Sequence, residues 1–123
     1  MGVGTGGAER NTSGCGGGAR AASEAAAGVV HALSERGQSR AVVESLTGGL
    51  LAATIVDIAG VSRVFRGGLV CYATELKTAL VGVPAGLLAE RGPVDPDVAA
   101  ALAEGGRQRC QADWALAATG VAG

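Results

Sequence analysis

The stretch VVESLTGGLL places hydroxyl groups at the point where an apolar run ends and a helical pattern begins. Ser45 follows the apolar run and Glu44, and Thr47 precedes the pair Gly48 and Gly49. In α/β proteins the end of a strand holds a side chain rigidly, and the helix that follows offers free backbone N–H donors. Ser45 is therefore a candidate for hydroxyl chemistry, with a phosphate or an oxyanion bound beside it.

Lys77 is the residue best suited to activate Ser45. The sequence ESLTGG is not a G-x-S-x-G elbow, and it has no histidine and acid in a recognisable triad arrangement. Lys77 lies in the first turn of a predicted short helix, five positions after Tyr72. Poor solvation there would favour the neutral amine, which can take a proton from a serine hydroxyl. Tyr72 would relay that proton or hold the lysine in place.

Structural interpretations compete with these functional ones. Most helix lysines are solvated charges and most strand tyrosines are packing residues, so residue type alone favours the structural interpretation of Lys77 and Tyr72. Thr47 is equally well explained as a helix N-cap before a glycine pair that permits a tight turn. Glu44 and Glu75 are interpreted as structural or orienting carboxylates, because no spacing marks them as a glycosidase pair.

Composition excludes several classes of function. The net charge of −1 and the single Trp, Tyr and Phe residues do not favour binding to nucleic acid or to an anionic membrane. Three widely spaced cysteines and one histidine predict a reduced, cytoplasmic protein with neither a protein-built metal site nor a cofactor. We find no pattern typical of an export signal or of a membrane span.

The elements that position these residues alternate between helix and strand. Residues 1–22 are rich in glycine and poor in large apolar groups, which predicts a disordered tail ahead of a domain at 23–123. Thr74 and Asp95 are expected helix caps. The predicted elements are a helix from Ser23 to Gly37, a strand at 40–44, a helix at 47–60, a strand at 67–73, short helices at 74–82 and 84–92, a longer helix from Pro96, and a strand within 113–123.

This alternation predicts a layered α/β fold with a largely parallel sheet. A ligand should then bind outside the carboxyl ends of the strands. Ser45, Tyr72 and Thr119 each lie at the end of a different predicted strand, so we expect their hydroxyl groups to meet at one edge of the sheet.

Four ordered motifs between residues 43 and 123 carry a family resemblance: E-S-x-T-G-G, G-x-S-x-x-F-x-G-G, Y-x-x-E-x-K and T-G-x-A-G. The sequence closely resembles the C-terminal domain of the CinA family, the nicotinamide-nucleotide amidohydrolases also called PncC. The resemblance implies a three-layer α/β/α sandwich around a mainly parallel or mixed sheet. Because the family pattern continues beyond the position of Gly123, we expect a domain truncated at its C-terminal end, with an uncovered sheet edge that favours a homo-oligomer.

The resemblance also implies a reaction, the hydrolysis of nicotinamide mononucleotide to nicotinic acid mononucleotide and ammonia in pyridine-nucleotide salvage. Ser45 would be the nucleophile, and Lys77 and Tyr72 would activate it. The alternative is a catalytically silent domain or a nucleotide-binding module. By motif matching, the residues that would line the substrate site are Thr47, Gly48, Gly49, Thr119 and Gly120.

Overall fold

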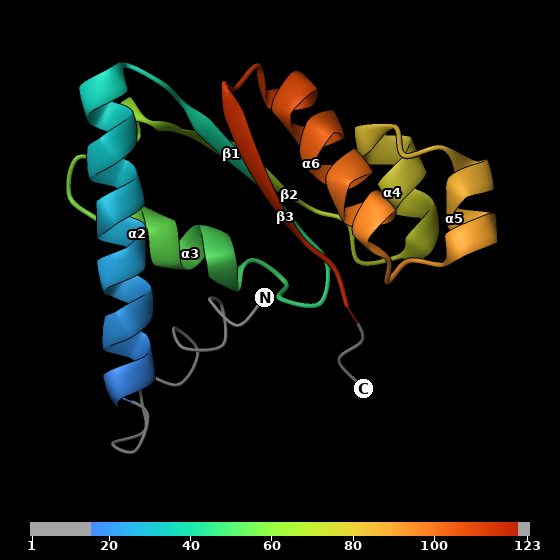
Figure 1. Ribbon diagram of the computed structural model, residues 1–123, viewed down its shortest axis with the longest axis horizontal. Helices are drawn as coiled ribbons and strands as arrows, with labels where there is room; N and C mark the ends of the chain where they lie inside the picture. Colours follow the sequence, from blue (N-terminus) through green and yellow to red (C-terminus); the bar gives the residue numbers. More distant parts are fainter. Residues whose placement is uncertain (1–15, 121–123) are drawn as a thin grey trace.

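The computed structural model describes residues 16–120, with side chains from Arg20 onward (Figure 1). Strands and helices alternate along this part of the chain. The elements are α2 (Gly16–Arg36), β1 (Arg40–Glu44), α3 (Leu50–Val56), the 3-10 helix η2 (Val61–Arg63), β2 (Phe65–Val70), α4 (Thr74–Val81), α5 (Ala85–Arg91), α6 (Pro96–Cys110) and β3 (Trp114–Ala118).

The described part of the chain forms a three-stranded parallel sheet in the order β2-β1-β3. Glu44, the last residue of β1, lies opposite Val70 of β2 and Ala118 of β3, so the three strands end at the same level. Ser45 and Thr119 each come directly after their strands, whereas Tyr72 lies two residues beyond the end of β2. That the three hydroxyl groups meet at this edge stays a prediction.

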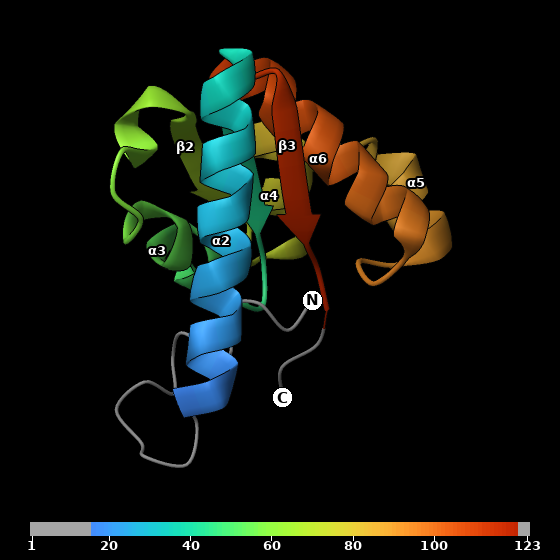
Figure 2. The ribbon, with the colours of Figure 1, turned by 60° about the vertical axis from the view of Figure 1, so that its left-hand side comes forward.

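Helices cover both faces of the sheet, which confirms the α/β class and the three layers (Figures 1 and 2). Alternate side chains of β1 enter two separate cores. Val42 packs with residues of α2 and α3, whereas Val43 packs with residues of α4, α5 and α6. Both valines are fully buried, as expected for a central strand of a parallel sheet.

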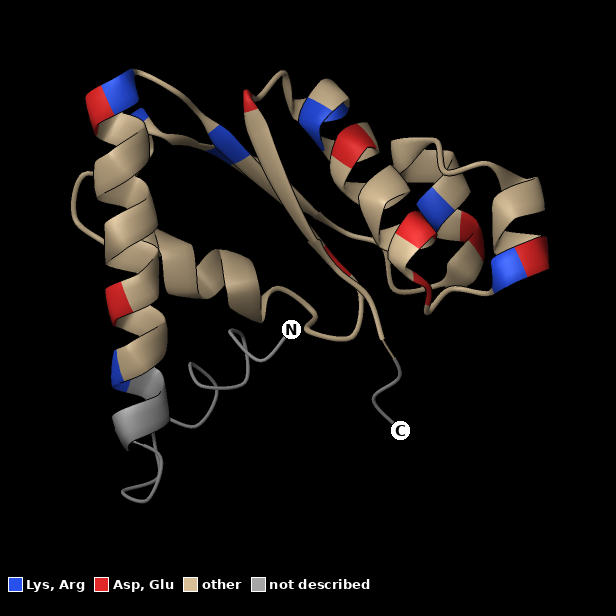
Figure 3. Cartoon of the chain, in the orientation of Figure 1, with Lys and Arg blue, Asp and Glu red and all other residues tan. Residues whose placement is uncertain are grey.

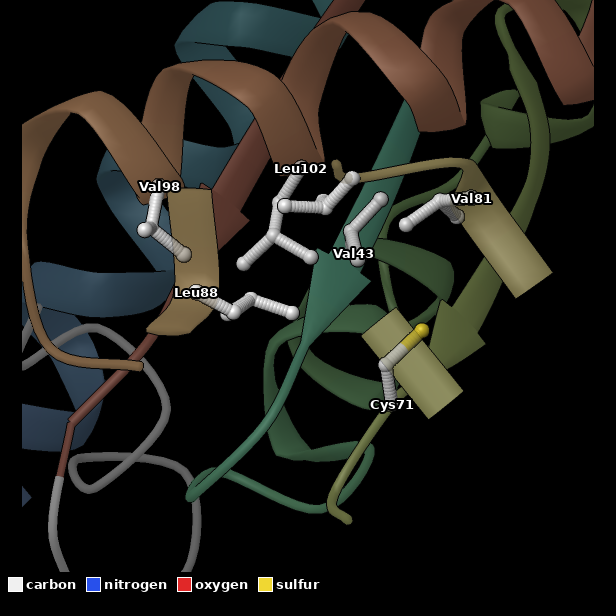
Figure 4. Close-up of a cluster of buried hydrophobic side chains, with 7 residues drawn as sticks. Val43, Cys71, Val81, Leu88, Val98 and Leu102 are labelled. Atoms are coloured by element: carbon white, nitrogen blue, oxygen red, sulfur yellow. The ribbon is translucent and has the colours of Figure 1, made fainter. Parts of the chain in front are cut away.

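The second core includes a close approach of α6 to the sheet (Figure 4). Its buried members are Val43, Cys71, Val81, Val83, Leu88, Val98 and Leu102. Two glycines of α6 allow this approach: a Cβ added at Gly106 would strike the Val43 side chain, and one added at Gly105 would strike the Val81 carbonyl. Small residues at these positions therefore set how closely α6 lies against β1 and α4.

The first helix begins earlier than predicted. Helix α2 starts at Gly16 and passes through Ser23, so Ser23 is not its N-cap and residues 16–22 of the predicted tail are helical. Ala22, one residue before Ser23, is already buried and begins the apolar stripe of α2. The apolar contacts of the helix therefore start before Ser23. The predicted tail at residues 1–15 lies outside the described residues.

Other predicted boundaries differ by a few residues. The second strand was predicted at 67–73, whereas β2 occupies Phe65–Val70. Thr74 is not a capping residue, because the N-cap of α4 is Ala73 and no side chain caps it. The prediction for Asp95 is confirmed, since its carboxylate accepts a hydrogen bond of 2.8 Å from the N–H of Asp97 at the start of α6.

Charged residues on the helices are mixed in sign (Figure 3). Arg107 pairs with Glu104 on α6, and Arg91 of α5 lies near Glu90, Asp95 and Asp97. His31 is an exposed residue of α2 that contacts Glu35, as expected for a surface histidine. Within residues 16–120, no helix has both the length and the hydropathy required to cross a bilayer.

Candidate active site

Lys77 and Ser45 meet at the carboxyl edge of the sheet. The Nζ atom of Lys77 lies 3.1 Å from the Oγ atom of Ser45, although 32 positions separate them in the sequence. Lys77 is 1% exposed and Ser45 is 5% exposed. The interpretation of Lys77 as a solvated surface charge is therefore wrong, and the pair has the geometry of a nucleophile beside a base.

Two backbone carbonyls complete the surroundings of the lysine amine. The Nζ atom donates to the carbonyl of Cys71 at 2.8 Å and to the carbonyl of Tyr72 at 3.2 Å. In the structure the Nζ atom also donates to the Oγ atom of Ser45. When the amine is neutral, its two N–H groups can bond to the two carbonyls, and its lone pair can then accept from the Ser45 hydroxyl. Sequence reasoning missed both acceptors, because a backbone carbonyl has no signature in residue type.

Burial lowers the pKa of the Lys77 amine below its usual 10.5, while the charges of Cys71 and Glu75 act in the opposite direction. The same loss of solvation raises the pKa of the fully buried Cys71 thiol. The Lys77 amine is thus biased toward the neutral form that general-base catalysis requires. The raised pKa of the neighbouring Cys71 thiol disfavours the thiolate, which is the form that would compete with Ser45 as a nucleophile.

The carboxylate of Glu44 occupies the N-terminus of α3. It accepts hydrogen bonds from the N–H groups of Gly49 at 3.1 Å, Leu51 at 2.9 Å and Ala52 at 2.9 Å. Gly49 is the N-cap residue, so the expectation that Thr47 caps this helix is wrong. The side chain of Glu44, immediately before Ser45, ties the strand end to the helix and thereby orients the turn that carries the serine.

The glycine pair has the backbone conformation that its residue type suggested. Gly48 has φ 61° and Gly49 has φ 114°, values at which a side chain would be strained. Their N–H groups are nevertheless engaged, since Gly48 donates to the Ser45 carbonyl and Gly49 to Glu44. The expectation that these two groups are free donors is wrong, and contact between the glycines and a substrate stays a prediction.

The remaining candidate residues surround the same edge in different ways. Tyr72 contributes its backbone carbonyl to Lys77, whereas its side chain is 62% exposed. Thr119 donates its hydroxyl to the Pro93 carbonyl at 2.7 Å, which ties the end of β3 to the loop before α6. Gly120 lies against the Leu46 side chain, where an added Cβ would be too close. A substrate contact by any of them stays a prediction.

Comparison with known proteins identifies the family of this chain. A family model described as the CinA C-terminal domain matches residues 20–123. The chain belongs to the CinA C-terminal domain family. The match begins within α2 and includes all three strands, so the Ser45 and Lys77 pair lies inside the CinA domain.

Relatives and solved structures agree with the assignment. CinA-like proteins of Frankia casuarinae and Geobacter sulfurreducens are 52% and 54% identical over 95 and 89 residues, which are 77% and 72% of this chain. The competence/damage inducible protein CihA from Agrobacterium tumefaciens superposes with a TM-score of 0.79 at 35% identity, covering 82% of this chain. The chain spans 22% of each of those two relatives and 61% of that structure.

Replacing Glu44 with glutamine should destabilise the CinA domain. The amide keeps the size of the carboxylate, but it presents an NH₂ group to at least one buried N–H donor of α3. We expect the free energy of unfolding to fall by about 2 kcal/mol. Urea denaturation measures this loss. Glu24→Gln, at an exposed position of α2, is the matched control and should change stability by less than about 0.5 kcal/mol; equal effects of the two variants would contradict the capping role of Glu44.

The lowered pKa of Lys77 predicts a pH-dependent stability. The unfolded chain keeps the lysine proton up to about pH 10.5, whereas the folded protein loses it at a lower pH. Between those two pKa values the unfolded state binds more protons, so the lysine contributes a rise in unfolding free energy with pH. Urea midpoints across this range should show that rise relative to Lys77→Met. The charges of Cys71 and Lys77 interact, so the difference between the two proteins reports the lysine together with its effect on the Cys71 thiol. Identical pH profiles would contradict the prediction.

Proposed function

We propose that this domain hydrolyses the carboxamide of nicotinamide mononucleotide, producing nicotinic acid mononucleotide and ammonia. The observation that carries the proposal is the buried hydrogen bond of 3.1 Å between the Lys77 amine and the Ser45 hydroxyl. The substrate was inferred from the resemblance to the CinA family. The match to the CinA C-terminal domain supports that inference. The activity and the substrate are proposals for a chain that covers only part of its relatives.

The chemistry follows from the two side chains. Neutral Lys77 takes the proton of Ser45 as Oγ attacks the amide carbon, and the protonated amine then returns a proton to the departing nitrogen. The C–N bond breaks, ammonia leaves, and the acyl group stays on Ser45. Water, deprotonated by Lys77, attacks the acyl carbon and releases the carboxylic acid and the serine. The net reaction consumes one water for each amide.

Incubation of the protein with nicotinamide mononucleotide tests the proposal. We expect ammonia and nicotinic acid mononucleotide to form in equal amounts, which an enzymatic ammonia assay and chromatography measure. Calorimetry with the same nucleotide separates binding from chemistry. Binding without ammonia release would contradict the proposal in favour of a silent nucleotide-binding module, and neither binding nor release would contradict both.

A further inference from the structure

The turn between β1 and α3 has few hydrogen-bond donors left for a ligand. Gly48 donates to the Ser45 carbonyl, Gly49 to Glu44, and Leu50 to the Thr47 carbonyl. The next N–H groups, at positions 51–53, donate to Glu44 or to the Gly49 carbonyl. The N-terminus of α3 is therefore filled by the protein's own carboxylate and cannot receive an anionic group of a ligand.

The unused donors all lie directly after Ser45. Among residues 16–120, the structure gives no hydrogen bond to the N–H groups of Leu46 and Thr47. The Oγ1 atom of Thr47 is buried and likewise has no partner within those residues. Buried hydroxyl groups in proteins are normally paired, so an unpaired one two residues from a candidate nucleophile calls for an explanation. Capping is not that explanation, because Glu44 performs it.

We propose that Thr47, through its hydroxyl group, donates a hydrogen bond to the carbonyl oxygen of the amide that Ser45 attacks. Ser45 and Thr47 belong to one tight turn, which the 3.1 Å hydrogen bond from the Gly48 N–H to the Ser45 carbonyl closes. The N–H groups of Leu46 and Thr47 lie in the same turn and add to this donor set. Negative charge that develops on the oxygen during attack is stabilised by such fixed donors.

The proposal also assigns the orientation of a substrate. With the carbonyl oxygen held at residues 46–47 and Glu44 at the start of α3, a phosphate on the same substrate is directed away from that helix. The orientation rests on the proposed amidohydrolase function, whereas the role of Thr47 in reactions at Ser45 extends to any carbonyl compound.

A simple ester tests the role of Thr47 separately from the proposed nucleotide substrate. With p-nitrophenyl acetate, Ser45 Oγ forms a bond to the acetyl carbon, the ester C–O bond breaks, p-nitrophenolate leaves, and Lys77 takes the serine proton. Intact-mass spectrometry follows the acetylated protein, and peptide mapping locates the acetyl group. We expect Thr47→Val to reduce the acylation rate constant about 100-fold, while Thr47→Ser, which keeps the hydroxyl, stays within about threefold of the unmutated rate.

Thr54→Val is the matched control, because Thr54 is a buried threonine of α3 whose hydroxyl donates to the Leu50 carbonyl. It should leave the acylation rate constant unchanged. Melting curves check that each variant is folded, and Thr47→Ala replaces Thr47→Val should the latter lack a transition. A folded Thr47→Val or Thr47→Ala protein acylated at the unmutated rate would overturn the inference, as would the absence of acylation at Ser45. Thr47-dependent acylation without ammonia release would overturn the nucleotide substrate and uphold Thr47.

Discussion

Ser45→Ala and Lys77→Met should each abolish ammonia release from nicotinamide mononucleotide. Alanine removes the oxygen that attacks the amide carbon, and methionine removes the amine that receives its proton. Because the two side chains act as one unit across a 3.1 Å contact, the double variant should be little slower than either single variant. We expect losses of at least about 1,000-fold in kcat, measured by the rate of ammonia formation.

Both variants should remain folded, so the loss can be assigned to chemistry. Lys77→Met places an apolar side chain of similar length at a position that is 1% exposed, and it removes the cost of burying an amine. Ser34→Ala, at an exposed serine of α2, is the matched control and should keep full turnover. Undiminished turnover in Ser45→Ala would show that Ser45 is only a turn residue and would refute the nucleophile assignment.

Gly105→Ala should destabilise the protein more than any other single-methyl addition to α6. Alanine normally favours a helix over glycine by about 1 kcal/mol. Here the added Cβ would fall inside the contact distance of the carbonyl oxygen and carbon of Val81, and backbone atoms cannot rotate away as a side-chain end can. Helix α6 would have to move from α4, which we expect to cost about 2–3 kcal/mol despite the better helix propensity.

Gly28→Ala on α2 is the control for this prediction. A Cβ at Gly28 has no neighbour within 4 Å, so only helix propensity acts and the variant should be stabilised by as much as about 1 kcal/mol. Urea denaturation of both variants measures the expected loss of stability in Gly105→Ala and the expected gain in Gly28→Ala. A stabilised Gly105→Ala protein would contradict the close packing of α6 on α4.

The arrangement of strands follows from local patterns in the sequence. The short stretch RAVVE at 40–44 predicts β1 with its observed bounds, and the alternation of strands with helices predicts that neighbouring strands are parallel. Asp95 before Pro96 predicts the start of α6, because an N-cap acts on the N–H groups next to it in the chain. These features depend on interactions between neighbouring residues, which a single sequence displays directly.

Helix ends that depend on distant groups could not be predicted in this way. Thr47 has the residue type of an N-cap, yet Glu44 performs the capping from the end of β1, because the turn brings its carboxylate back onto the first N–H groups of α3. Similarly, α2 starts at Gly16, within a glycine-rich stretch whose composition predicts disorder. This start could not be predicted, because the burial of Ala22 depends on the packed fold.

The candidate site shows the same division between sequence and structure. The sequence alone determined that hydroxyl groups follow the strands at one edge of a parallel sheet, and the family motifs singled out Ser45 and Lys77. Only the tertiary structure decided that the lysine is desolvated and lies against the serine, because solvation depends on every element packed around the amine. The charge state on which its chemistry depends is therefore a property of the folded domain, since water and a low-dielectric interior stabilise an ammonium group very differently.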